Sequence, residues 1–253
     1  MASSRINEDR SNRSAAFRAV LEGKRRSVEN FRRFWKEEGV NPLDKCGDTV
    51  LHFLAIHGNA AAFKLLLQDG LVTSENLKAK NVNGNIALRE VARFGHKDVA
   101  EIMIRTENKL VSESNKLGET PLFMAAACGK KEVFSLLEKH IGDCMMRRND
   151  GWHIDDSMMR SDGCTILHVA VIGECYSLAI GILESYPDLS GKRNEKGKTT
   201  LPILAAKPES FSNPWLKEID DAKQRHAVAL MLAERLIRRE DWSHSVHAED
   251  KDL

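Results

Sequence analysis

Residues 118–129 read G-E-T-P-L-F-M-A-A-A-C-G, and this stretch decides the fold because related stretches recur along the chain. In every copy a leucine stands four residues after the leading glycine, and in four of the five copies a threonine stands two residues after it. The leading glycines are 37, 34, 45 and 34 residues apart, a period typical of stacked repeats. The copies begin at Gly47, Gly84, Gly118, Gly163 and, more weakly, Gly197.

Each motif position has a physical reason for its residue type. The leading glycine permits a tight turn with positive φ, and the threonine hydroxyl can cap the first helix. Proline suits the first helical turn, as at Pro121, because its missing N–H needs no partner there. The leucine is expected in the core, and the alanine four residues later keeps the helix thin. Gly58, Gly95 and Gly129 are expected to end the first helix, after which a second helix with paired apolar residues follows.

This recurrence resembles the ankyrin family, whose repeats run to about 33 residues around a T-P-L-H-x-A core. The resemblance predicts an all-α ankyrin-repeat solenoid of about five to six helix-turn-helix repeats with short hairpin loops. The recognisable repeats start near residues 44, 81, 115, 160 and 194. The family's motif histidine hydrogen-bonds backbone and ties repeats together, a role that the resemblance implies for His52 and His168. Arg89 and Pro202 replace this histidine and the closing glycine of the fourth repeat shifts to Gly173, so distortion is expected in these repeats.

The two ends of a repeat stack need caps with one polar face. Residues 12–40 are interpreted as a degenerate first repeat, and residues 1–11 as a disordered N-terminus. Asn213-Pro214 is a helix start signal, and apolar residues recur at helical spacing beyond it. A C-terminal capping helix is therefore expected over 214–240, followed by a flexible tail over 241–253.

The interval between the third and fourth copies contains extra residues, which fall near 145–162. A long loop in a compact domain is often functional, and methionine side chains adapt to varied partners. The alternative is that these side chains pack on the edge of the repeats. Both interpretations stay open for the apolar residues of this insertion, which are Met145, Met146, Trp152, Met158 and Met159.

The family resemblance implies contact positions beside the leading glycine and at the end of the first helix, on the concave surface of the stack. Such a surface binds a peptide or a folded partner through apolar anchors and polar edges. For Phe94 and Ile172, packing between repeats is the alternative to partner contact. The predicted contact residues are Lys45, Asp48, Ile56, His57, Val82, Asn85, Arg93, Phe94, Lys116, Leu117, Glu119 and Ile172.

Composition and motifs argue against several other classes of protein. The formal net charge of +1 does not call for nucleic acid. The five cysteines include no C-x-x-C pair, which disfavours disulfides and structural zinc and indicates a reducing compartment. No phosphate-binding glycine motif and no reproducible catalytic cluster is present. We therefore expect no enzyme activity, no cofactor and no metal. We expect protein partners and a cytoplasmic location, without membrane insertion by this chain.

The segment from Ser185 to Phe211 narrows the resemblance. It reads S-Y-P-D-L-S-G-K-R-N-E-K-G-K-T-T-L-P-I-L-A-A-K-P-E-S-F and is similar to a plant subfamily of ankyrin-repeat proteins. Members of that subfamily carry a C-terminal membrane domain with a Pro-Gly-Gly motif and are linked to stress and defence signalling. The resemblance implies an alternative function, the cytosolic regulatory region of a larger membrane signalling or channel-like protein. The location would then be the cytosolic face of a membrane.

Overall fold

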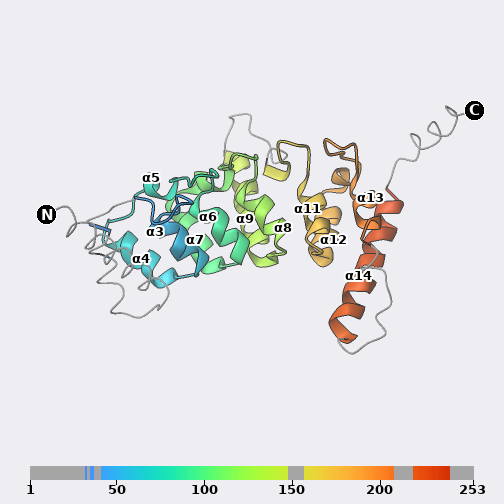
Figure 1. The fold of residues 1–253 in the computed structure, drawn as a ribbon, viewed down its shortest axis with the longest axis horizontal. Helices are drawn as coiled ribbons and strands as arrows, with labels where there is room; N and C mark the ends of the chain where they lie inside the picture. The colour runs from blue at the N-terminus through green and yellow to red at the C-terminus, as the bar shows by residue number, and fades with distance from the viewer. Residues whose placement is uncertain (1–31, 33–34, 37–40, 148–156, 208–218, 240–253) are drawn as a thin grey trace, which may run out of the picture. The chain divides into compact units, whose positions relative to one another are not determined.

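A computed structural model describes residues 32, 35–36, 41–147, 157–207 and 219–239. The chain forms two compact units, Met1–Ala125 with Lys130–Ser157, and Ala126–Gly129 with Met158–Leu253. Both units are built from helices (Figure 1). Within the described residues, the extended backbone pairing is limited to one isolated bridge between Met159 and Thr165.

The first unit stacks helix pairs in two rows. Short first helices pack side by side, with α3 against α6, and the longer second helices pack in a row of α4, α7 and α9. The helices of this unit are α3 (Val50–Ile56), α4 (Ala60–Gln68), α5 (Ser74–Leu77), α6 (Ala87–Phe94), α7 (Lys97–Thr106), η1 (Asn108–Ser112) and α9 (Lys131–Arg147), and α8 (Pro121–Ala127) spans the boundary between the units.

The second unit is built on the same plan. Its first helices are α11 (Ile166–Ile172) and α13 (Thr200–Ala205), which pack on each other. Its second helix is α12 (Tyr176–Ser185), followed by the single turn η2 (Pro187–Ser190). The C-terminal helix α14 (Ile219–Ile237) runs beside α12 and α13 (Figure 1).

The motif positions occupy the places that the sequence predicts in the first four copies. The motif leucines are 0–1% exposed, and the alanines Ala55, Ala92 and Ala126 are 0% exposed. The five leading glycines have φ between 68° and 80°, a region that other residues avoid. Helix α8 begins at Pro121, as expected. The all-α repeat prediction is confirmed by this agreement between motif and backbone.

The fifth copy differs from the prediction because α13 buries only one of the two faces that the other first helices bury. Leu201 is half-buried and Ala205 is exposed, whereas Thr200 and Leu204 are 0% exposed. In the first four copies the residues three and seven after the leading glycine are buried together with those four and eight after it, so α13 keeps the first face and leaves the second partly open. The predicted inward position of Leu201 and Ala205 is therefore wrong.

Helix α14 lies inside the predicted range 214–240. It buries Ala229, Leu232 and Leu236, and it contacts α12 and α13. Met231, which belongs to the predicted apolar stripe, is 48% exposed.

In the predicted N-terminal cap, Trp35 is 6% exposed and the guanidinium of Arg32 binds the carboxylate of Asp69. The predicted disordered N-terminus, the rest of the cap and the predicted flexible tail lie outside the described residues.

The insertion is shorter than the loop predicted over 145–162. Helix α9 continues to Arg147, so Met145 and Met146 are helical. Met158 is 1% exposed, which supports packing for this residue, while Met159 is 44% exposed. Trp152 lies outside the described residues.

The fourth repeat closes its first helix with a residue that is not glycine. Glu174 occupies the position equivalent to Gly58, Gly95 and Gly129, and it adopts a left-handed φ of 59°. Gly173 has an ordinary φ of −79°, but a Cβ atom there would collide with the carbonyl oxygen of Ala127. The glycine thus serves a close backbone approach, and Glu174 takes the strained conformation that glycine adopts in the other repeats.

Candidate functional site

Neighbouring hairpins of the first unit are joined by backbone hydrogen bonds. The Val82 N–H donates to the Cys46 carbonyl over 2.9 Å, and the Lys116 N–H donates to the Asn83 carbonyl over 3.1 Å. The second unit repeats the arrangement, with the Glu195 N–H donating to the Asp162 carbonyl over 2.8 Å. Because the bonds recur at equivalent positions, the hairpins of the first unit form a regular row.

An asparagine three residues before the leading glycine shapes several of the hairpins. Asn81 Oδ1 accepts the N–H groups of Asn83 and Asn85, each over 3.0 Å. Asn115 and Asn194 make the same pair of bonds at equivalent positions in their own hairpins. Asparagine suits such turns because its side chain can replace a backbone acceptor. The recurring N-x-x-G spacing was the signal in the sequence, and our sequence analysis missed it.

The two motif histidines tie neighbouring repeats, as the resemblance implied. His52 Nε2 lies 2.9 Å from the Asn85 carbonyl, and His168 Nε2 lies 3.2 Å from the Lys198 carbonyl. The other ring nitrogen, Nδ1, accepts the N–H of Thr49 or Thr165. Burial lowers the pKa of His168 below its ordinary value, which favours the neutral ring. These histidines are therefore structural links between repeats.

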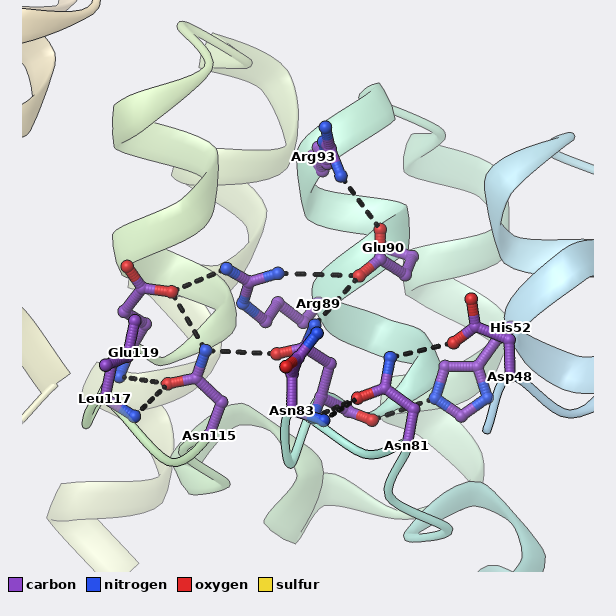
Figure 2. A network of polar contacts seen from close by, with 11 residues as sticks. Asp48, His52, Asn81, Asn83, Arg89, Glu90, Arg93, Asn115, Leu117 and Glu119 are labelled. Atoms are coloured by element: carbon purple, nitrogen blue, oxygen red, sulfur yellow. Dashed lines mark hydrogen bonds and ion pairs between the residues drawn. The ribbon is translucent and has the colours of Figure 1, made fainter. Parts of the chain in front are cut away.

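Arg89 replaces the histidine in the second repeat and makes an ionic link instead (Figure 2). Its Nη2 lies 2.5 Å from Glu119 Oε2, and its Nη1 lies 3.4 Å from Glu90 Oε1. All three residues are at most 9% exposed. The expected distortion of this repeat is wrong, since α6 is a regular helix that ends at Gly95 in the left-handed region. A buried ion pair thus takes over the role of the histidine.

Asn85 and Glu119 belong to this network and not to the open surface. Asn115 Nδ2 donates to Asn85 Oδ1 over 3.0 Å and to Glu119 Oε2 over 2.9 Å (Figure 2). Asn85 is 8% exposed and Glu119 is 7% exposed. Both were predicted as partner contacts, but their side chains are buried and engaged inside the protein. We therefore leave them out of the candidate contact surface.

Three predicted apolar contacts of the first unit are open to solvent. Val82 is 52% exposed, Leu117 is 56% exposed and Phe94 is 42% exposed. Val82 and Leu117 lie in the second and third hairpins, and Phe94 ends α6. Residues of the same repeats that face the helix stack, such as Leu88 and Leu122, are fully buried. The exposed side chains are large enough to serve as anchors for a partner.

Arg93 and Phe94 form one exposed group. The Arg93 guanidinium lies 5.6 Å from the centre of the Phe94 ring, and this ring stacks on His96 with 6.3 Å between the ring centres. Arg93 Nη1 is 3.9 Å from Glu90 Oε2, which connects the group to the buried network. The Phe94 ring is thus packed against His96 on one side and remains 42% exposed, which leaves part of it open to a partner.

The other predicted contacts differ in exposure. Lys45, His57 and Lys116 are exposed, and Ile56 is half-buried. Asp48 is also half-buried, and its carboxylate accepts a hydrogen bond from Asn81 Nδ2 over 2.8 Å. Ile172 is 50% exposed and belongs to the second unit, so we treat it separately. The candidate contact surface of the first unit consists of Lys45, Asp48, Ile56, His57, Val82, Arg93, Phe94, Lys116 and Leu117.

Within the described ranges, no group of three or more His, Cys, Asp or Glu side chains is arranged to hold a metal ion. Over the same part of the chain, no helix has the length and apolar character needed to cross a bilayer.

Residues 16–112 match the family model for ankyrin repeats, in three copies. The match begins within the segment interpreted as a degenerate first repeat and covers the first two recognisable repeats. The repeated helix pairs, the hairpins and the motif contacts continue beyond residue 112. The fold is an all-α ankyrin-repeat fold. Ankyrin repeats generally mediate interactions between proteins, and proteins built from them are typically non-catalytic.

Proposed function

We propose that this ankyrin-repeat chain is a non-catalytic module that binds a protein partner through the contact surface of its first unit. The observation that carries the proposal is the exposure of Val82, Phe94 and Leu117 at three separate places of that surface. Leaving three large apolar side chains in water is unfavourable, and a partner that covers them would gain the free energy of their burial.

The supporting structure is a rigid base beneath these side chains. The hairpins are fixed to one another by backbone hydrogen bonds, and the buried ion pair between Arg89 and Glu119 links α6 to the third hairpin. A surface held in place loses little conformational entropy when a partner binds. This preorganisation favours recognition of another protein.

The experiment compares proteins captured by the whole chain with those captured by the double variant Arg93→Ala/Phe94→Ala. A matched control, Lys97→Ala/Lys131→Ala, changes exposed residues on second helices. We expect the first variant to lose the specific partners while its far-UV circular dichroism is unchanged, and the control to retain them. Retention of all partners by the Arg93/Phe94 variant would place binding elsewhere, on the opposite face or near Met159 and Ile172.

The segment from Ser185 to Phe211 favours a second candidate, the cytosolic regulatory region of a larger membrane signalling or channel-like protein in stress or defence signalling. The two candidates place the chain in the cytoplasm and at the cytosolic face of a membrane, respectively. Reading the gene beyond Leu253 distinguishes them, because a spanning helix needs an apolar run of about 20 residues.

A further inference from the structure

The charge on the contact surface points to the chemistry of the partner. Its exposed charged side chains are Lys45, Arg93 and Lys116, and all three are cations. In the part of the chain that the structure describes, Lys45 and Lys116 make no ion pair, so neither charge is neutralised from within. The side chain of Arg93 is 57% exposed despite its contact with Glu90. The available charge on this surface is therefore positive.

The acidic residues nearby are already engaged. Glu90 and Glu119 are buried and share the guanidinium of Arg89. The Asp48 carboxylate accepts a hydrogen bond from the Asn81 side chain, and the carboxylate of the exposed Asp44 accepts one from the Asp48 N–H over 2.9 Å. Asp44 is exposed and offsets the charge of Lys45 in the first hairpin, so the exposed cations that it does not balance are Arg93 at the end of α6 and Lys116 in the third hairpin. Electrostatic complementarity favours an acidic partner there.

The order of side chains along the hairpins adds a pattern. Lys45, Val82 and Lys116 occupy the same position in three successive hairpins, two residues before the leading glycine. The backbone bonds from Val82 and Lys116 place these hairpins next to one another. A segment that crosses the row meets a cation, an apolar side chain and a second cation, with Leu117 beside the last.

We propose that the hairpin row of the first unit binds a segment of a partner protein in which acidic side chains flank an apolar one. This inference rests on the proposed function, because it assigns a chemical class to the partner of the same surface. The carboxylates of Glu90 and Glu119 are buried beside Arg89, so neither is exposed to such a segment.

The test selects random linear peptides, displayed on phage, against the whole chain. Selected peptides are synthesised and their Kd values measured on the Arg93→Ala/Phe94→Ala variant and on three further double variants. The variant Lys45→Glu/Lys116→Glu reverses the charge of the row. The variant Lys64→Glu/Lys139→Glu makes the same change at exposed positions of second helices. The variant Val82→Ser/Leu117→Ser removes apolar contacts and reports whether a peptide binds at the row. Circular dichroism and thermal unfolding verify that each variant folds.

We expect the selected peptides to combine aspartate or glutamate with an apolar residue. Their Kd should rise at least about tenfold in the Lys45/Lys116 variant, with little change in the Lys64/Lys139 variant. The affinity should also fall as salt concentration rises, because exposed charges are screened.

Two other results would overturn the inference in different ways. Neutral or basic peptides that need Val82 and Leu117 would refute the acidic partner and leave the proposed function standing. If no selected peptide is sensitive to the Val82/Leu117 variant or to Arg93→Ala/Phe94→Ala, both proposals fail. Sedimentation of the chain alone tests a second copy as the occupant, and self-association abolished by the Lys45/Lys116 variant would replace the acidic segment with that copy.

Discussion

Arg89 shows how one substitution in a repeat motif changes the chemistry between repeats. A histidine at this position binds the backbone carbonyl of the next repeat, as His52 and His168 do. The guanidinium of Arg89 binds the side chain of Glu119 instead, and it also contacts Glu90. Among the described residues, no acceptor binds its buried Nε, so the guanidinium depends on the two carboxylates to offset its desolvation.

Replacing Arg89 by methionine should lower the free energy of unfolding by about 3–5 kcal/mol, because it leaves two buried carboxylates without their cation. Urea unfolding of the purified chain measures this loss. The double variant Arg89→Met/Glu119→Met removes one of those carboxylates together with the cation and should regain part of the stability. A single variant as stable as the parent would show that the pair contributes little.

Glu174 offers the opposite case, a position at which the sequence is not optimal. Its φ of 59° is strained for a residue with a side chain, and its carboxylate lies 3.0 Å from the Lys207 ammonium at the surface. Glycine there should stabilise the chain by about 0.5–1 kcal/mol, since a surface ion pair is worth less than the relief of strain. Chemical denaturation measures the change, and Glu174→Gln separates the ion pair from the backbone effect. A lower stability for Glu174→Gly would mean that the ion pair outweighs the strain.

At the scale of the helix, burial at equivalent motif positions decides the effect of a substitution. Leu122 and Leu167 are 0% exposed, whereas Leu201 on the partly open face of α13 is half-buried. Truncation of Leu122 or Leu167 to alanine should lower the free energy of unfolding by about 2–5 kcal/mol. The matched Leu201→Ala variant should lose clearly less. Equal losses at all three positions in urea unfolding would show that α13 buries Leu201 as the other repeats bury their leucines.

The same comparison shows how far the sequence predicts the elements. Glycine, threonine and leucine at fixed spacing specify the turn, cap and buried face of a first helix by local chemistry alone. That is why the positions of Leu51, Leu88, Leu122 and Leu167 could be predicted. The partial exposure of one face of α13 depends on which elements pack around it, here α11 and α14, and a local motif does not encode those neighbours.

The candidate surface was predictable to a similar degree. Val82, Phe94 and Leu117 are exposed as the family resemblance implied. Asn85 and Glu119 occupy equivalent contact positions, yet they are buried because Asn115 and Arg89 bind them. Arg89 lies 30 residues before Glu119, so the pairing could not be inferred from either repeat alone.

At the scale of the whole molecule, the division into two compact units predicts uneven stability. Each repeat contacts mainly its neighbours, so a local defect should weaken its own surroundings most. Leu167→Ala should accelerate amide hydrogen exchange in α11, α12 and α13 far more than in α3, α4 and α6. Mass spectrometry of proteolytic fragments measures this pattern. Equal acceleration in both groups would show that the chain opens as one cooperative body.

The ionic link between Arg89 and Glu119 has a consequence for how such a chain can evolve or be rebuilt. A histidine that binds a backbone carbonyl can link to any following repeat, because every residue has that carbonyl. Arg89 can link only to a repeat with a carboxylate at the matching position, and Glu119 in turn needs the arginine in the repeat before it. The second and third repeats should therefore be exchanged only as a matched pair, because duplication, deletion or grafting of either one alone would strand a buried charge.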